Sequence, residues 1–126
     1  MVQISNNGWL SMHRGDSFEL PLFISTGECG DNTRFNLREN TPNRVYLGVM
    51  EPNQPFECAL IRKKYEVFGD EKRDPPMTED GDLIISFKPT DTEFVTPGKY
   101  FYEIKLERND GAVDTIVPRT EFFIME

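Results

Sequence analysis

Apolar and polar residues alternate along several short segments of this chain. The segment that begins at residue 17 places four apolar side chains on one face, Phe18, Leu20, Leu22 and Ile24. Such a period of two predicts a half-buried β-strand. Because Pro21 lies inside this segment and cannot donate a ladder hydrogen bond, we expect the strand at a sheet edge or beside a bulge. Residues 44–50, 56–67 and 82–88 alternate in the same way and predict three further strands.

The most regular alternation lies near the C-terminus. Residues 99–107 are followed by the turn Asn109-Asp110-Gly111, and a second alternating segment covers residues 112–117. An Asp-Gly pair between two such segments is typical of a β-hairpin. Pro118 interrupts the return strand before the alternation resumes at Phe122, so we expect either a bulge there or a strand that changes sheets.

No longer segment shows helical periodicity with caps, so any helix should span no more than a turn or two. Together with two short strands expected before residue 13, the chain has about seven strands, which is typical of a sandwich. We therefore predict an all-β fold, an antiparallel β-sandwich that forms one domain over residues 1–126, with its strand core over about 14–124. Two long polar loops, 25–43 and 68–81, are where we expect partners to bind.

The charge of the chain is negative and unevenly distributed. Its 126 residues include 14 Lys and Arg against 22 Asp and Glu, a net charge of −8 at pH 7. Such a domain gains nothing from counterion release at a phosphate backbone, so nucleic acid is not an expected partner. Much of the acid lies in the two long loops, whereas Arg62, Lys63 and Lys64 form a compact basic segment on one predicted strand. This asymmetry suggests that subunits could pair acidic loop against basic strand.

Composition excludes three further classes of protein. Aromatic residues make up 12% of the chain, which is too many for a disordered acidic tail. No apolar run approaches the roughly 18 residues that a membrane-spanning helix needs, so we expect no membrane partner. The two cysteines, Cys29 and Cys58, are too few for a disulfide scaffold and are expected as free thiols of a protein that folds in a reducing cytoplasm.

Catalytic chemistry is not expected. His13 is the only histidine, and no Ser or Cys has a recognisable nucleophile setting. The many carboxylates are not flanked by the aromatic residues expected of a sugar-cleaving cleft. We therefore predict that the chain is not an enzyme, with no catalytic residue, no cofactor and no resident metal.

Two segments look like binding motifs, and both have a simpler structural interpretation. Arg14-Gly15-Asp16 spells the integrin-binding tripeptide but leads straight into the first strand, so we interpret it as a turn. The loop 68–82 contains six carboxylates, Asp70, Glu71, Asp74, Glu79, Asp80 and Asp82. Calcium prefers such oxygen ligands, but their spacing is not that of an EF-hand loop. An ordinary charged loop is favoured, and a weak calcium site is the alternative.

Several large apolar residues fall on the strand faces opposite the predicted core. They are Phe23, Tyr46, Met50, Phe101, Phe123 and Met125. In a two-layer sandwich these faces should be polar. Either a long loop or the N-terminal segment with Trp9 covers them, or they contact another protein. The candidate interface residues are Trp9, Phe23, Tyr46, Phe101 and Phe123.

A set of segments in a fixed order carries a family resemblance. The segments are Arg14-Gly15-Asp16-Ser17-Phe18, residues 44–50, Asp80-Gly81-Asp82-Leu83-Ile84-Ile85-Ser86-Phe87, Asp91-Thr92, residues 97–106, Asp110-Gly111 and Thr115-Ile116. Over roughly residues 14–124, this arrangement resembles the N-terminal domain of phage baseplate upper proteins. The resemblance implies an immunoglobulin-like β-sandwich without catalytic activity.

The resemblance also implies a function and a location. The chain would be a structural or assembly module of a phage or prophage tail or baseplate, acting through protein–protein contacts. Its partners would be other virion or tail proteins, or a second copy of itself, and it would reside in the virion after synthesis in the cytoplasm of the bacterial host. An extracellular or cell-surface module that binds carbohydrate or protein on the same sandwich is the alternative.

Immunoglobulin-like folds use a tyrosine corner, in which a tyrosine hydroxyl bonds to the backbone a few residues upstream. Tyr100 and Tyr102 are the two candidates, with the turn at residues 91–98 as the acceptor region. Either tyrosine would then stabilise the fold and would have no direct role in binding.

Overall fold

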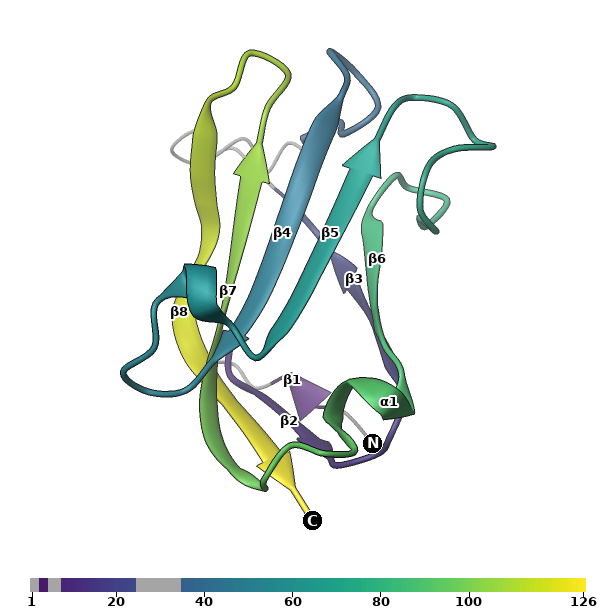
Figure 1. Ribbon diagram of the computed structural model, residues 1–126. Helices are drawn as coiled ribbons and strands as arrows, with labels where there is room; N and C mark the ends of the chain where they lie inside the picture. Colours follow the sequence, from purple (N-terminus) through teal and green to yellow (C-terminus); the bar gives the residue numbers. More distant parts are fainter. Residues whose placement is uncertain (1–2, 5–7, 25–34) are drawn as a thin grey trace.

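The structure is a computed structural model that describes residues 3–4, 8–24 and 35–126 (Figure 1). Eight strands and two short helices follow one another in this part of the chain. They are β1 (Gln3–Ile4), β2 (Leu10–His13), β3 (Phe18–Leu22), β4 (Asn43–Met50), η1 (Phe56–Cys58), β5 (Ile61–Val67), β6 (Leu83–Phe87), α1 (Pro89–Thr92), β7 (Gly98–Glu107) and β8 (Val113–Met125). The predicted all-β class is confirmed, and each helix is about one turn long.

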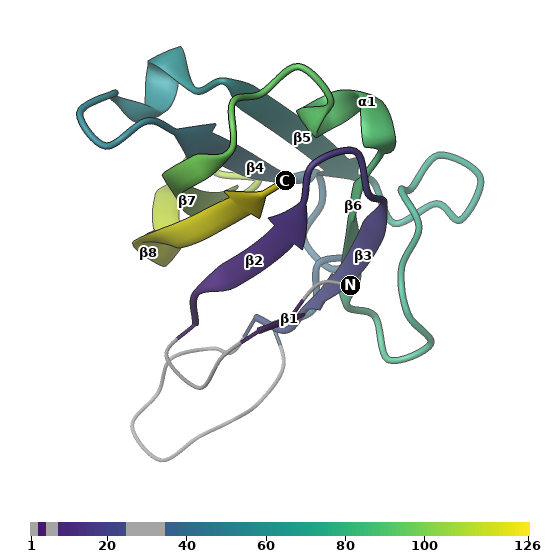
Figure 2. The ribbon, with the colours of Figure 1, turned by 90° about the horizontal axis from the view of Figure 1, so that it is seen from below.

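The strands form two sheets (Figure 2). The larger sheet has six strands in the order β1-β2-β8-β7-β4-β5, and the smaller one pairs β3 with β6. The run β8-β7-β4-β5 opposite β3-β6 corresponds to strands G, F, C and C′ opposite strands B and E of a variable-type immunoglobulin sandwich. The chain therefore forms the predicted sandwich of about seven strands, with the very short β1 in addition.

One strand pair departs from the purely antiparallel arrangement that we expected. β2 runs parallel to β8, with Leu10 opposite Phe122 and His13 opposite Met125. Parallel neighbours need a long connection, and here nearly the whole domain lies between the two strands. A period of two is the same for either strand direction, so the residue pattern could not reveal this pairing.

The hydrophobic core lies between the two sheets, on the strand faces that the alternation predicts. The small sheet contributes Leu20, Leu22, Leu83, Ile85 and Phe87, none more than 9% exposed. The large sheet contributes Val45, Leu47, Val49, Tyr100, Tyr102, Ile104, Leu106, Phe122 and Ile124. Burial of each such side chain is worth about 1.5–3 kcal/mol, so these two faces supply much of the driving force for folding.

The strand predicted over residues 56–67 is only partly correct. Phe56–Cys58 form η1, and β5 covers only Ile61–Val67. Pro52 and Pro55 lie in the connection before η1 and cannot donate ladder hydrogen bonds. The chain therefore leaves the sheet after β4, and η1 lies in front of the sheet in Figure 1 before the chain enters β5.

The predicted hairpin is confirmed, and it contains a bulge. β7 and β8 pair from Gly98 opposite Ile124 to Glu107 opposite Val113. The register shifts twice, first between the Tyr102–Thr120 and Ile104–Val117 pairs and again between the Ile104–Val117 and Lys105–Thr115 pairs. Each shift leaves one extra residue on β8, and the first lies beside Pro118. β8 remains in the same sheet along its whole length. Of the two alternatives for Pro118, the structure has the bulge and not the change of sheet.

Pro21 and Tyr65 each lie in a strand at an edge of the sandwich. Among the described residues, β3 pairs with β6 alone, so Pro21 sits in an edge strand as predicted. On the other edge, the Tyr65 hydroxyl of β5 accepts a hydrogen bond from the Ser86 N–H at 3.3 Å, which links the two sheets.

An ion pair joins β5 of the large sheet to α1, the helix that follows β6. The Lys63 ammonium lies 2.7 Å from the Asp91 carboxylate of α1. Burial acts to raise the pKa of Asp91, but the Lys63 ammonium and the Lys88 backbone N–H together hold it below its ordinary value. Lys63 therefore belongs to the framework that joins β5 to α1.

Tyr100 forms the tyrosine corner. Its hydroxyl donates to the carbonyl oxygen of Thr96, four residues upstream and just before β7. The Tyr102 hydroxyl instead donates to the Gly8 carbonyl at 2.5 Å, which ties β7 to the segment before β2. Burial raises the pKa of both hydroxyls. Both tyrosines thus stabilise the fold, but only Tyr100 has the local geometry of the corner.

Candidate functional site

The structure brings four of the five candidate interface residues to one sheet. Tyr46, Phe101 and Phe123 lie on the outer face of the six-stranded sheet, on β4, β7 and β8. Trp9 precedes β2 and contacts Phe123. Phe23 follows β3 of the smaller sheet and is 49% exposed. The five residues therefore do not form a single surface, since Phe23 belongs to the opposite layer.

An aromatic patch occupies the end of the outer face where β7 begins and β8 ends. We define it as Trp9, Phe101, Phe123 and Met125. The rings of Trp9 and Phe123 meet edge to face, with centroids 5.7 Å apart. Phe101 is the diagonal neighbour of Phe123 across β7 and β8, because its partner is Glu121. The patch is therefore continuous over three neighbouring strands.

Charged residues border this patch. Lys99 forms an ion pair with Glu121 at 2.9 Å, and its ammonium lies 5.6 Å from the centre of the Phe101 ring. Met125 is 38% exposed, while Trp9, Phe101 and Phe123 are half-buried. Trp9 thus gives part of the intramolecular cover that the sequence suggested, and the remaining apolar surface faces outward.

Met50 was expected on the exposed face, and that expectation is wrong. Its side chain is fully buried, although it follows Tyr46 and Gly48 in phase on β4. The connection between β4 and β5 folds back at this end of the sheet, and the Leu60 N–H bonds to the Val49 carbonyl at 2.8 Å. Intramolecular cover therefore accounts for Met50.

Gly48 allows the connection between β4 and β5 to approach β4 closely. A Cβ atom at Gly48 would lie 2.9 Å from the Phe56 ring and 3.1 Å from the Ala59 Cβ, both closer than ordinary contacts. The Lys105 ammonium lies 4.6 Å from the centre of the same Phe56 ring. A lone glycine inside a strand pattern often marks such a close approach, so Gly48 was a signal in the sequence for a contact that the strand pattern alone does not predict.

Gly48→Ala is expected to destabilise the protein by about 1–3 kcal/mol, because the added methyl group must displace Phe56 or Ala59. Gly98→Ala is the matched control. Gly98 also lies in a strand, and its added Cβ would meet only the Tyr100 ring at 3.9 Å. Urea denaturation of both variants checks the prediction. Equal stability of the two variants would contradict the packing of Phe56 on β4.

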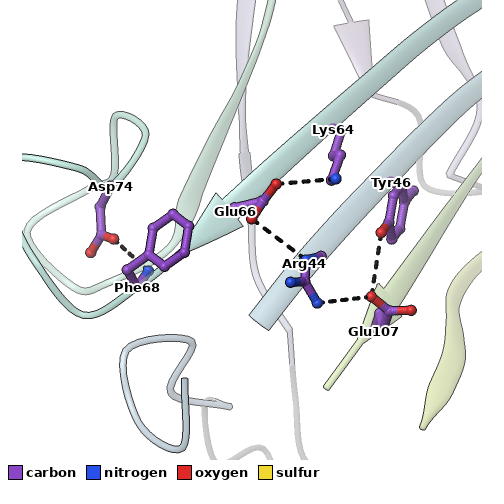
Figure 3. Close-up of polar contacts among 7 residues, drawn as sticks. All are labelled: Arg44, Tyr46, Lys64, Glu66, Phe68, Asp74 and Glu107. Carbon is purple, nitrogen blue, oxygen red and sulfur yellow. Dashed lines mark hydrogen bonds and ion pairs between the residues drawn. The ribbon is translucent and has the colours of Figure 1, made fainter. Parts of the chain in front are cut away.

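The other end of the outer face carries a network of charged residues (Figure 3). Arg44 lies 3.5 Å from Glu66 on β5 and 3.2 Å from Glu107 on β7. The Tyr46 hydroxyl donates to Glu107 at 3.3 Å, and Lys64 pairs with Glu66 at 3.1 Å. The hydrogen bond from Lys64 is the main cause of a lowered pKa at Glu66. These residues satisfy one another across three strands, so this end of the sheet is polar and internally paired.

His13 and the Arg14-Gly15-Asp16 turn lie at one end of the sandwich. His13 is exposed at the end of β2, with Nδ1 3.0 Å from the Glu126 carbonyl oxygen. Gly15 has a φ of 84°, and its N–H donates to the Thr92 hydroxyl at 2.9 Å. The Asp16 N–H bonds to the His13 carbonyl at 3.1 Å. The tripeptide therefore forms the structural turn that the sequence indicated.

Asp74 organises the acidic loop 68–82 (Figure 3). Its side chain is 1% exposed, and Oδ1 accepts a hydrogen bond from the Phe68 N–H at 2.6 Å. Oδ2 lies 3.5 Å from Nε of Arg38. Asp70 in the same loop accepts from the Lys72 N–H at 3.0 Å. These two carboxylates fix turns, and no group of three His, Cys, Asp or Glu in the described ranges could hold a metal ion.

The remaining sequence expectations concern cysteines, long loops and membranes. Cys58, the last residue of η1, is an exposed free thiol, whereas Cys29 and the rest of residues 25–34 lie outside the described residues. Within the part of the chain that the structure covers, no helix is long and apolar enough to cross a membrane.

Comparison with known proteins gives no further assignment. No family model matches the chain, and no curated protein matches it. The function must therefore be argued from the residues and from the geometry of the outer face.

Proposed function

We propose that this chain is a non-enzymatic structural or assembly module of a phage or prophage tail or baseplate. It acts through contacts with other virion or tail proteins, or with a second copy of itself, and it resides in the virion after synthesis in the host cytoplasm. The resemblance over residues 14–124 supports this role, and the aromatic patch is the observation that carries it.

The composition of the patch is that of an interface centre. Aromatic residues and Met are enriched at protein–protein interfaces, while a polar rim surrounds them. Here Phe101 and Phe123 lie on adjacent strands, and the Lys99–Glu121 pair stands beside them. Because strands hold these side chains in place, little conformational entropy is lost when a partner covers them.

Incorporation into particles tests this function directly. In a strain that carries the gene, particles released after prophage induction are purified on a density gradient and analysed by mass spectrometry. We expect the chain to co-sediment with tail proteins in a fixed ratio. Intact particles that lack the chain would contradict the proposal.

Phe101→Ser is expected to reduce incorporation by about tenfold or more, as loss of an interface anchor does. The matched control is Phe23→Ser, which makes the same change at a phenylalanine of the opposite layer. Thermal melts of both variants show whether folding is preserved. Equal loss of incorporation in the two variants would contradict the assignment of the aromatic patch.

A further inference from the structure

A hollow opens on the outer face between the aromatic patch and the charged network. Its volume is about 320 Å³, and it is lined by Tyr46, Gly48 and Phe56 together with the basic residues 62–64. This volume lies at the lower end of the range for small-molecule sites, roughly 300–1,000 Å³. The hollow has room for one ring-sized ligand.

The charged residues that line this hollow are all basic. Tyr46 lies opposite Lys64 on β5 and opposite Lys105 on β7. In the next row of the same face, Gly48 lies opposite Arg62 on β5 and opposite Glu103 on β7, and Glu103 pairs with Lys105 at 3.6 Å. No acidic residue lines the hollow, although the chain as a whole carries a net charge of −8. Since Glu103 is paired with Lys105, the basic residues of the lining favour an anion.

Arg62 has hydrogen-bond donors available for a ligand. Its guanidinium donates to the Glu57 carbonyl oxygen, and among the described residues no carboxylate forms an ion pair with it. A guanidinium has five N–H donors in a planar fork that matches a carboxylate. Lys64 lies 5.9 Å from the centre of the Tyr46 ring and forms an ion pair with Glu66 at the surface, and such pairs contribute little stability. Both cations can therefore turn to a bound anion at low cost.

Contacts with neighbouring residues hold the two aromatic walls of the hollow in place. The Phe56 ring lies against Gly48, and the Lys105 ammonium is beside it. The Tyr46 hydroxyl is held by Glu107 at 3.3 Å. Walls that are ordered before binding reduce the entropy lost by the complex.

From this arrangement we propose that the hollow binds a cyclic carboxylate, an organic acid whose carboxylate is carried on a single sugar ring or a single aromatic ring. The carboxylate pairs with Arg62 and Lys64, and the ring lies against Tyr46 and Phe56. This ligand site is distinct from the aromatic patch and does not depend on the assembly role.

A titration followed by amide chemical shifts tests the site. Galacturonate and benzoate are the two ring-bearing acids, galactose and benzyl alcohol are their neutral counterparts, and acetate and inorganic phosphate are the anions without such a ring. We expect shifts at residues 46–48 and 62–64, with a Kd about tenfold or more lower for a ring-bearing acid than for the other probes. The tighter of the two ring-bearing acids identifies the ring type.

Two outcomes would overturn the proposal. One is binding of acetate or phosphate as tight as that of both ring-bearing acids, which would indicate a nonspecific anion site. The other is the absence of shifts at the hollow with either ring-bearing acid at concentrations where the amides remain well resolved.

Arg62→Gln provides the matched variant. It is expected to weaken binding of the preferred acid about tenfold, since a charge-assisted hydrogen bond is lost from an exposed side chain. Arg14→Gln removes the same charge in the turn after β2. Three strands lie between β2 and β5, and exposed charges that far apart are screened, so this variant is expected to change Kd by less than about twofold. Equal weakening in both variants would show a net-charge effect and overturn the site. Incorporation into particles is a separate readout, so failure here leaves the assembly proposal standing.

Discussion

Tyr102→Ala is expected to lower the free energy of unfolding by about 3–5 kcal/mol, the usual cost of truncating a large buried aromatic residue. The Tyr102 side chain is only 5% exposed. Its ring meets Phe122 with centroids 6.0 Å apart, in the centre of the large sheet. The substitution removes this packing and also the hydrogen bond to the Gly8 carbonyl.

Two phenylalanine variants separate the ring from the hydroxyl. Tyr102→Phe and Tyr100→Phe keep the ring and remove only a hydrogen bond to the backbone, at Gly8 and at Thr96 respectively. Each variant should lower the free energy of unfolding, measured by urea denaturation, by about 1 kcal/mol. If Tyr102→Ala lowers the free energy of unfolding no more than Tyr102→Phe does, then the Tyr102 side chain of β7 does not face the core.

The pH dependence of stability gives a second measure of the same residue. Burial raises the pKa of the Tyr102 hydroxyl in the folded protein. Its contribution is therefore complete below the ordinary pKa of about 10 and is lost as the pH rises through the higher folded value. Tyr102→Phe should flatten the alkaline decline of the melting temperature relative to the unmodified chain.

Period-two alternation identified the core because each strand buries a single face. Leu83, Ile85 and Phe87 were assigned to the core from spacing alone, and all three are buried. The same spacing could not show what covers the opposite face. Met50 alternates in phase with the outward-facing residues of β4, yet its side chain is completely buried.

For the candidate interface residues, the sequence predicted the outward faces but not the sheet to which each residue belongs. Sequence position assigns Phe23 and Phe101 equally to outward faces, but it does not say which sheet each strand joins. That depends on pairing between strands far apart in the chain, such as β2 with β8. The hollow beside Tyr46 depends on Phe56, which the alternation placed in a strand. Gly48 was the one local signal that a side chain from elsewhere lies on β4.

Asp74→Ala is expected to lower the free energy of unfolding by about 1–3 kcal/mol, because it removes a buried carboxylate and leaves the part-buried Phe68 N–H without its acceptor. The Phe68 N–H loses its acceptor, and Arg38 loses its carboxylate. The Arg73 guanidinium stacks on the Phe68 ring at 4.0 Å, so a displaced Phe68 also loosens the turn that contains Arg73. Amide hydrogen exchange over residues 68–82 should accelerate accordingly.

Asp70→Ala is the matched control for this loop. Asp70 accepts a backbone hydrogen bond from Lys72, as Asp74 does from Phe68, but its side chain is exposed to water. Water can replace the lost acceptor at Asp70, so the cost should stay below about 1 kcal/mol. Urea denaturation of both variants measures the difference. An equal loss of unfolding free energy in the two variants would mean that the buried Asp74 does not organise the loop. The carboxylates of the loop would then act only as surface charge.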